Sequence, residues 1–533
     1  MKTWTDGTLY VFDPDSLEPG SPEHDRVLHA ARNSYESYQI LLKNQEEFTI
    51  TGVRFEGFEG AGEICFRYNF QETISFAKTD FQDPLSNEAS RKVGAGLIQS
   101  VWITAHIGKN AKRGIYAGQV VIVTDNGEYP SELKVRVYSA VLPDNHEAAF
   151  ATEYWMNTVN FWFRYPSPDQ MDFLNYYYGC ERYSDEWWDI NRAIAVHMRE
   201  NRINVLFVRT HDLLLDGGTV LDDDGRYHFH WELFDRWISF FDQYADVKWF
   251  AGYHLVVQAV GKDVYIIDNV DGKPQIIISP IGSEKTENWL KQFLTALNEH
   301  LDETGYKGRW MQHIEDEASA SDSWLYAVGF VRKFLPGVRC MDAIDTQKAM
   351  PPLQDHMDVW IPRVDVYEKN RDFYDYRLAR GDSRWVYNCC VPGYQNYTNK
   401  FLGWPIIHNR VLPWACFVNH FSGFLHWGYD FWDPQDTWFG LTPTTHFKGD
   451  GYIVYPDAPS KSIRNSIRMI ATRDGAQDFE LLSILAFLNA EAAFRMARKV
   501  VTRFNDFNWE TENMEAVRIE ILEEIEKYHD RER

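Results

Sequence analysis

The sequence predicts a multidomain protein of the β plus α/β class. It should contain an N-terminal β-sandwich, a (β/α)8 TIM-type barrel and a C-terminal, mainly helical extension. Three observations predict this order: short strand-like runs at the start, repeated strand–helix units in the middle, and long helical periodicity at the end. A chain of 533 residues supports the division, because single cores stop growing at about 250–300 residues. The expected domains are 1–145, 146–445 and 446–533.

The first domain is predicted from short runs of alternating or β-branched residues with turn residues between them. Asp125-Asn126-Gly127 is typical of such a turn. Regular spacing of short strands is typical of a β-sandwich. The predicted strands are 37–44, 48–57, 63–70, 97–107, 117–125 and 132–142.

Strand and helix patterns alternate after residue 150, which predicts parallel strands and, with eight of them, a barrel. A doubly wound open sheet is the alternative, but no glycine-rich nucleotide-binding turn follows the first strand. The predicted strands are 151–155, 203–209, 247–255, 309–314, 338–344, 358–364, 384–391 and 423–432. The predicted helices are 185–201, 231–245, 285–303, 321–334, 366–379 and 404–419.

Composition narrows the class of partner. The net charge of −24 and pI near 5.1 disfavour nucleic acid and anionic membranes. No run of 18 apolar residues and no signal-peptide pattern are present, so we expect a cytoplasmic protein. The six cysteines show no metal-ligand spacing, and the adjacent Cys389 and Cys390 are expected to be buried thiols. Nothing in the sequence indicates an oligomeric state.

The run Glu315-Asp316-Glu317 directly follows the fourth predicted strand, at the barrel face where active sites form. Aromatic residues make up 16% of the chain and suit the apolar faces of sugars. Carboxylates beside aromatic rings at a barrel face favour glycoside hydrolysis, which requires a protonated carboxylic acid. The alternative is that these three carboxylates form the solvent-exposed start of a helix, because acidic residues favour the first helical turn.

Adjacent side chains diverge along a strand, so Asp316 and Glu317 cannot easily flank one glycosidic bond from opposite sides. They could divide the reaction between them. Glu317 would donate the proton, and Asp316 would hold a 2-acetamido group whose carbonyl oxygen attacks the anomeric carbon. The charge of Asp316 is also expected to raise the pKa of Glu317.

Further substrate contacts are predicted from position at strand ends and from residue type. The spacing of His211, His254 and His313 does not indicate a metal site, so neither a metal nor another cofactor is expected. The predicted carbohydrate-binding residues are Trp427, Tyr429, Asp430, Trp432, His254, Asn388 and Tyr394.

Several motifs then give the chain a resemblance to glycoside hydrolase family 123. They are 31-ARNSYESYQILLKN-44, 101-VWITAHI-107, 113-RGIYAGQVVI-122, His313-x-x-Asp316-Glu317, 426-HWGYDFW-432, 449-GDGYIVYP-456 and 464-RNSIRMIATRDGAQDFELL-482. The resemblance implies a β-sandwich before a barrel and β-N-acetylgalactosaminidase activity. It implies that Asp316 orients the acetamido group and that Glu317 is the general acid/base. Ala318 stands where the family commonly has proline, and uncharacterised relatives share the C-terminal segment.

The leading expectation is therefore a retaining exo-β-N-acetylhexosaminidase, galactosaminidase-like, that uses substrate-assisted catalysis. One alternative is a two-carboxylate glycosidase for a sugar without an acetamido group, with Glu317 as acid and Asp430 or Asp345 as its partner. Another is a carbohydrate-binding protein without catalysis. The charged residues of the last motif are expected to form a structural network: Arg473, Asp474, Asp478 and Glu480.

Overall fold

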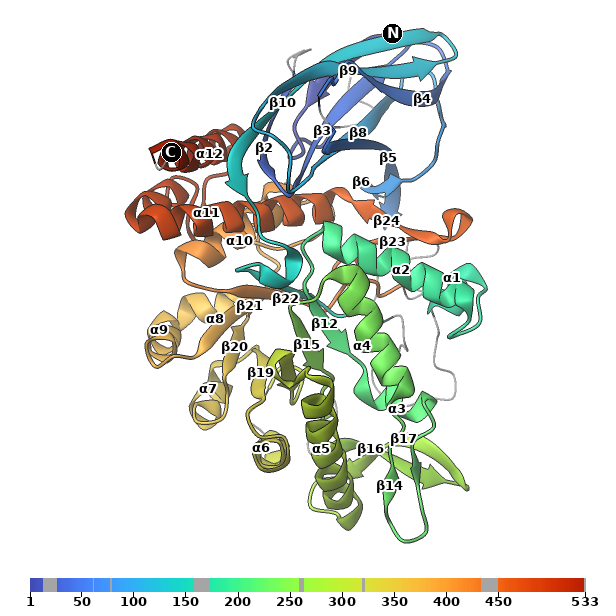
Figure 1. The fold of residues 1–533 in the computed structure, drawn as a ribbon, viewed down its shortest axis with the longest axis vertical. Helices are drawn as coiled ribbons and strands as arrows, with labels where there is room; N and C mark the ends of the chain where they lie inside the picture. The colour runs from blue at the N-terminus through green and yellow to red at the C-terminus, as the bar shows by residue number, and fades with distance from the viewer. Residues whose placement is uncertain are drawn as a thin grey trace.

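The computed structural model places an N-terminal β-rich region above a barrel, with one long helix lying between them (Figure 1). None of its described helices is both long and apolar enough to cross a bilayer. The described residues are 1–12, 26–60, 62–76, 79–157, 173–257, 263–318, 322–432 and 449–531.

Two sheets form the N-terminal region and share one hydrophobic core, to which Ile40 and Val101 contribute from one sheet and Ile122 and Val135 from the other. One sheet has the order β1 (Lys2–Asp6), β3 (Ser34–Lys43), β8 (Ile98–Ile107), β5 (Ile64–Phe76), β6 (Thr79–Ser86), β24 (Ser462–Ser466) and β23 (Tyr455–Asp457). The other has the order β2 (Arg26–Arg32), β10 (Gly127–Val141), β9 (Gly114–Thr124), β4 (Phe48–Glu56) and β7 (Arg91–Val93). All six predicted strands are present, although β1, β2, β6, β7, β23 and β24 were not predicted.

Eight parallel strands close into a barrel, as predicted. The closing pair joins β11 to β22, with Ala151 opposite Gly423. Inward side chains such as Val205, Met311 and Leu425 fill the interior with an apolar core. The strands in order are β11 (Ala151–Tyr154), β12 (Val205–Val208), β15 (Trp249–Gly252), β18 (Trp310–His313), β19 (Arg339–Ile344), β20 (Val359–Pro362), β21 (Ser383–Tyr387) and β22 (Gly423–His426).

The predicted helices lie between these strands, and the segment 366–379 is divided into two helices at Asn370. Ser184 and Ser283 cap two of them by accepting hydrogen bonds from the backbone N–H groups of Trp187 and Thr286. The helices are α2 (Asp185–Glu200), α4 (Glu232–Ala245), α5 (Glu284–Thr304), α6 (Asp322–Phe334), α8 (Val364–Lys369), α9 (Arg371–Ala379) and α10 (Ile407–Val418).

Short elements decorate this framework and were not predicted. The largest is a hairpin, β16 (Asp263–Val270) and β17 (Lys273–Pro280), inserted between β15 and α5. The others are α1 (Phe173–Tyr178), α3 (Thr210–Asp216), β13 (Val220–Leu221), β14 (Tyr227–His228), α7 (Met350–Leu353), β25 (Val501–Arg503) and β26 (Asp506–Phe507).

The C-terminal segment contacts both other parts of the molecule. Its strands β23 and β24 extend the N-terminal sheet, where β24 pairs with β6. Helix α11 (Ile467–Ala497) packs on α10, and α12 (Thr511–Arg531) packs on α11 and β10. A Cβ at Gly475 would lie 2.4 Å from the Arg410 carbonyl oxygen, so only glycine permits this close approach of α11 to α10. The predicted boundary at residue 445 lies outside the described residues, and the domain division stays a prediction.

Buried ion pairs join α10, α11, α12 and the N-terminal region. Fully buried Asp478 accepts hydrogen bonds from Arg410 Nε at 2.9 Å, Arg518 Nε at 2.8 Å and Trp414 Nε1 at 3.0 Å. Arg518 also donates to Glu36 on β3 at 2.7 Å. The predicted structural role of Asp478 is therefore confirmed by its contacts.

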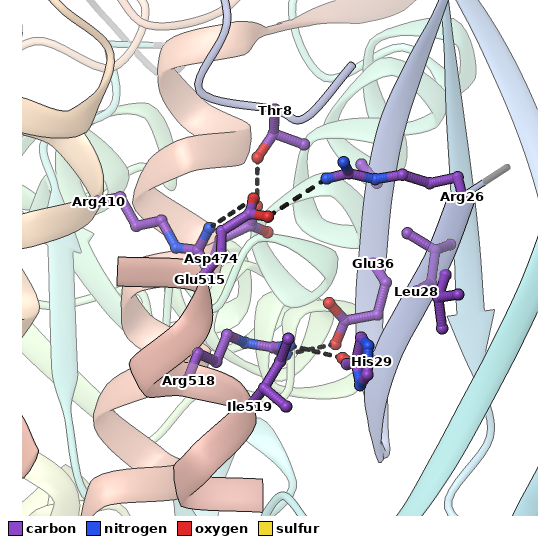
Figure 2. A pocket seen from close by; sticks show the side chains of 12 residues that line it. Thr8, Arg26, Leu28, His29, Glu36, Arg410, Asp474, Glu515, Arg518 and Ile519 are labelled. Atoms are coloured by element: carbon purple, nitrogen blue, oxygen red, sulfur yellow. Dashed lines mark hydrogen bonds and ion pairs between the residues drawn. The ribbon is translucent and has the colours of Figure 1, made fainter. Parts of the chain in front are cut away.

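A small cavity lies within this network, where Thr8 donates to Asp474 and Arg26 pairs with Glu515 (Figure 2). Its volume is about 50 Å³. A buried water needs about 10–15 Å³ by this measure, so the cavity has room for a few waters and none for a sugar ring.

Replacing Asp478 with alanine should lower the midpoint of thermal unfolding clearly. The change leaves two buried guanidinium groups without this partner, and breaking a buried ion pair costs about 3–5 kcal/mol. The matched control is Glu47→Ala, which breaks an exposed pair with Lys92 at 2.8 Å. That variant should melt like the wild type. Equal midpoints for the two variants would contradict the assigned role of Asp478.

Candidate active site

The C-terminal ends of the barrel strands bring four polar side chains into one neighbourhood. Glu317 follows β18, Asp345 follows β19, Arg363 follows β20, and Tyr387 is the last residue of β21. The Tyr387 hydroxyl donates to Glu317 Oε1 at 3.0 Å, and Asp345 and Arg363 both act electrostatically on Glu317. Glu317 therefore faces the side of the barrel formed by β19, β20 and β21.

Burial raises the pKa of Glu317, and the negative charge of Asp345 raises it further. The hydrogen bond from Tyr387 and the charge of Arg363 oppose this rise. The net direction is a raised pKa, which increases the protonated fraction that a general acid needs.

Asp316 faces a different set of groups. Its charge acts on Tyr253, directly after β15, and on Tyr265, which the β16–β17 hairpin supplies. The two tyrosine hydroxyls hydrogen-bond each other. Burial and then the charge of Glu317 raise the pKa of Asp316 well above its ordinary value. The expected rise of the Glu317 pKa thus comes from burial and Asp345, while repulsion within the pair raises the pKa of Asp316.

The backbone explains how two consecutive side chains reach different surroundings. The strand β18 ends at His313, and Asp316 and Glu317 form a turn. Glu317 has φ of +50°, in the left-handed region that costs a residue with a Cβ about 1–2 kcal/mol. Such strain is concentrated at functional sites, where the surrounding structure maintains it.

A layer of buried polar side chains supports this turn. Asp342 accepts hydrogen bonds from the backbone N–H groups of Ile314 at 3.0 Å and Glu315 at 3.2 Å, and from Trp324 Nε1 at 2.7 Å. Its Oδ1 lies 3.2 Å from His313 Nδ1. Asp342 thereby holds the two residues that immediately precede Asp316.

His313 lies fully buried between two carboxylates, with its Nε2 3.1 Å from Glu153 Oε1 and its Nδ1 near Asp342. Burial alone would lower its pKa, but the charge of Glu153 and the hydrogen bonds to both carboxylates raise it to about 10. The ring is therefore an imidazolium that donates from both nitrogens.

One nitrogen from each of His254 and His313 and one oxygen of Asp342 lie within 4.8 Å of one another. These three atoms could serve as ligands in a metal site. His313 fits this role poorly, because both of its nitrogens carry protons held by carboxylates. Burial, followed by the charge of His313, holds the pKa of His254 well below its ordinary value. His211 lies elsewhere, packed against Trp289 and Phe293.

The predicted residues around β22 divide into two groups. Trp427 is half-buried and donates to Asp450 Oδ2 at 2.8 Å. Tyr429, Asp430 and Trp432 are instead buried in the protein interior. They bond to His197 Nδ1, the Asn157 backbone and the Val454 carbonyl, respectively. The two aromatic rings and the Asp430 carboxyl group therefore make contacts within the protein interior in this structure.

The other predicted contacts are also dispersed. His254 packs against His313 and Tyr253 beside the buried layer. Asn388 is fully buried and donates to the Thr398 carbonyl at 3.2 Å. Tyr394 is 74% exposed on the segment after β21. Among the predicted residues, the structure brings together Asp316 and Glu317, with His254 nearby.

Comparison with known proteins identifies the family. The family model described as "Glycoside hydrolase 123, catalytic domain" matches residues 170–485, which is more than half of the chain. The chain belongs to glycoside hydrolase family 123. It is a glycosidase, and its substrate is a carbohydrate.

A solved family 123 glycoside hydrolase from Clostridium perfringens, reported with the details of glycolipid glycan hydrolysis, has a similar fold. Its TM-score is 0.74 at 16% identity, and the match covers 99% of this chain and 98% of that one. A putative glycoside hydrolase from Bacteroides vulgatus matches at 8% identity with a TM-score of 0.30, over 86% of this chain and 79% of that one. No curated protein matches the sequence.

Several residues around the site of this family 123 enzyme were not predicted from sequence. Tyr387 ends β21 and Arg363 directly follows β20, but the predicted strands 384–391 and 358–364 extend past both residues, so the strand-end rule pointed to later positions. Glu153 and Asp342 are within strands, where burial beside a histidine leaves no sequence signal. Tyr265 comes from an inserted hairpin, and only the fold brings it near Asp316.

The stability contributed by His313 should depend on pH in a direction set by its raised pKa. Its ion pairs contribute fully below its unfolded value near 6.5 and are lost as pH rises through about 10. The difference in unfolding midpoint between the wild type and His313→Gln should therefore narrow over this range. The half-exposed His230 provides the control, since His230→Gln should leave the midpoint unchanged throughout. A His313→Gln difference that stays constant or widens would contradict the ion-pair assignment.

Proposed function

We propose that this family 123 enzyme is a retaining exo-β-N-acetylhexosaminidase, galactosaminidase-like, with the substrate's 2-acetamido group as nucleophile. One observation carries the proposal. The adjacent carboxylates leave a strained turn in different directions, Asp316 toward Tyr253 and Tyr265, and Glu317 toward Asp345 and Tyr387. Such a pair can serve two different atoms of one sugar.

In the first step, Glu317 would protonate the glycosidic oxygen as its bond to the anomeric carbon breaks. The acetamido carbonyl oxygen would attack that carbon and form an oxazolinium ring, which Asp316 would orient and stabilise. Water would then open the ring, with the Glu317 carboxylate accepting its proton. Two inversions at one carbon retain the configuration. The raised pKa of Glu317 supports its role as the acid.

A two-carboxylate mechanism is the second candidate, and the position of Asp345 favours it. Asp345 is half-buried, and among the charged groups it makes the largest contribution to raising the pKa of Glu317. Asp430 is less suited to the partner role, because it is buried and accepts the Asn157 backbone N–H at 2.8 Å. Burial also raises the pKa of Asp430 to about 7.

Glu317→Gln should lower hydrolysis of nitrophenyl N-acetyl-β-galactosaminide by several orders of magnitude, because it removes the proton donor. Asp316→Ala should also lower it strongly while the protein stays folded by circular dichroism. The matched control is Glu315→Gln, which makes the same chemical change within the same run and should retain most of the activity. A thiazoline derived from N-acetylgalactosamine should inhibit competitively. Full activity of Glu317→Gln would end the proposal, and no thiazoline inhibition would favour the two-carboxylate mechanism.

The alkaline limb of the pH profile should move in opposite directions in two variants. Tyr387→Phe removes a hydrogen bond that lowers the pKa of Glu317, so the limb of kcat/KM should move to higher pH. Asp345→Asn removes a negative charge that raises this pKa, so the limb should move to lower pH. Unmoved limbs in both variants would show that Glu317 is not the titrating acid. Loss of all activity in Asp345→Asn would instead favour Asp345 as a nucleophile.

A further inference from the structure

Two adjacent cysteines follow β21, directly after the strand that supplies Tyr387 to Glu317. Cys389 and Cys390 are both free and half-buried, so the prediction that they are buried thiols is wrong. Cys65 is exposed on β5, far from them in the N-terminal sheet, while the three remaining cysteines are buried.

The backbone after β21 brings the two thiols together. Consecutive side chains point to opposite faces along a strand. Here the strand ends at Tyr387 and the chain bends at both cysteines, with the Cys389 backbone N–H donating to the Val391 carbonyl at 3.2 Å. The Cys389 thiol donates to the same carbonyl at 3.7 Å, and the Cys390 thiol interacts directly with that of Cys389. They form a preassembled pair of soft ligands.

This pair also belongs to the neighbourhood of the catalytic acid. Cys389 packs against the apolar core of the barrel interior, which includes Tyr387. Cys390 experiences the charges of Asp450, Glu317 and Arg363.

We propose that Cys389 and Cys390 form a vicinal dithiol that binds a thiophilic metal or metalloid centre and thereby blocks the catalytic site. A trivalent arsenical is the clearest case. An arsenic–oxygen unit would react with both thiols to give two As–S bonds, and the two thiol protons and the oxygen would leave as water. No oxidation or reduction takes place. The bound group would lie two residues from Tyr387, where it would crowd Glu317.

Chelation distinguishes this site from an ordinary reactive thiol. A second thiol beside the first raises affinity by about 10²-fold or more, because the second bond forms within one molecule. A competing dithiol should therefore remove the arsenical, whereas a monothiol at the same thiol concentration should not. The expected loss of activity rests on the proposed function, whereas binding of the arsenical does not.

The test uses phenylarsine oxide with the full-length, reduced protein. Intact mass should show one phenylarsenic group added with loss of two protein hydrogens, and hydrolysis of the aryl glycoside should stop. Dimercaptopropanol should restore the activity, and 2-mercaptoethanol should not. Cys390→Ser and, independently, Cys389→Ser should retain activity but require about 100-fold more reagent for the same adduct. Cys65→Ser should behave like the wild type.

Three results would overturn the proposal. The first is that one of the serine variants binds the reagent as tightly as the wild type. The second is that dimercaptopropanol does not remove the adduct. The third is that the fully modified protein keeps its activity. If the unmodified protein does not hydrolyse nitrophenyl N-acetyl-β-galactosaminide, the proposed function fails instead. The mass measurement would then still decide whether the dithiol binds the arsenical.

Discussion

The buried charges on the first half of α11 are the constraint on which the arrangement of the molecule depends. A charged group can be buried only where partners replace its water, and the partners of these residues come from every other part of the chain. Arg468 donates to Asp83 on β6 and to the carbonyls of Lys400, Gly449 and Tyr452. Gln477 binds both backbone groups of Tyr35 on β3. One helix therefore sets the position of the N-terminal sheets against the barrel.

The same helix reaches the neighbourhood of Asp316 and Glu317 through the first barrel strand. Glu480 accepts hydrogen bonds from the backbone N–H groups of Ala149 and Phe150, immediately before β11. Glu153 on that strand bonds to His313, which bonds to Asp342, and Asp342 holds the backbone before Asp316. These buried contacts are continuous and largely ionic. They offer a physical reason why the turn can maintain a left-handed Glu317 despite its cost.

The carboxylate pair could be located from sequence because the strand-end rule depends only on the order of strands and helices. That order can be predicted from the alternating strand and helix patterns. It was less informative about the residues after β22. The aromatic run there has the composition of a sugar-binding wall, yet Tyr429 and Trp432 are fully buried and bond to α2 and to the Val454 carbonyl. An aromatic ring satisfies either role, and composition alone does not distinguish a packed ring from an exposed one.

The sequence by itself determined the order of the eight barrel strands, most of their helices, and the strand end that carries Asp316 and Glu317. These features follow from local periodicity and from a general rule about parallel strands. Only the tertiary structure decided which groups surround each carboxylate. Tyr387, Asp345 and Arg363 around Glu317, and Tyr265 near Asp316, come from separate elements that meet when the barrel closes. Burial and charge at a site are sums over such distant neighbours, so they cannot be read from the residues on either side.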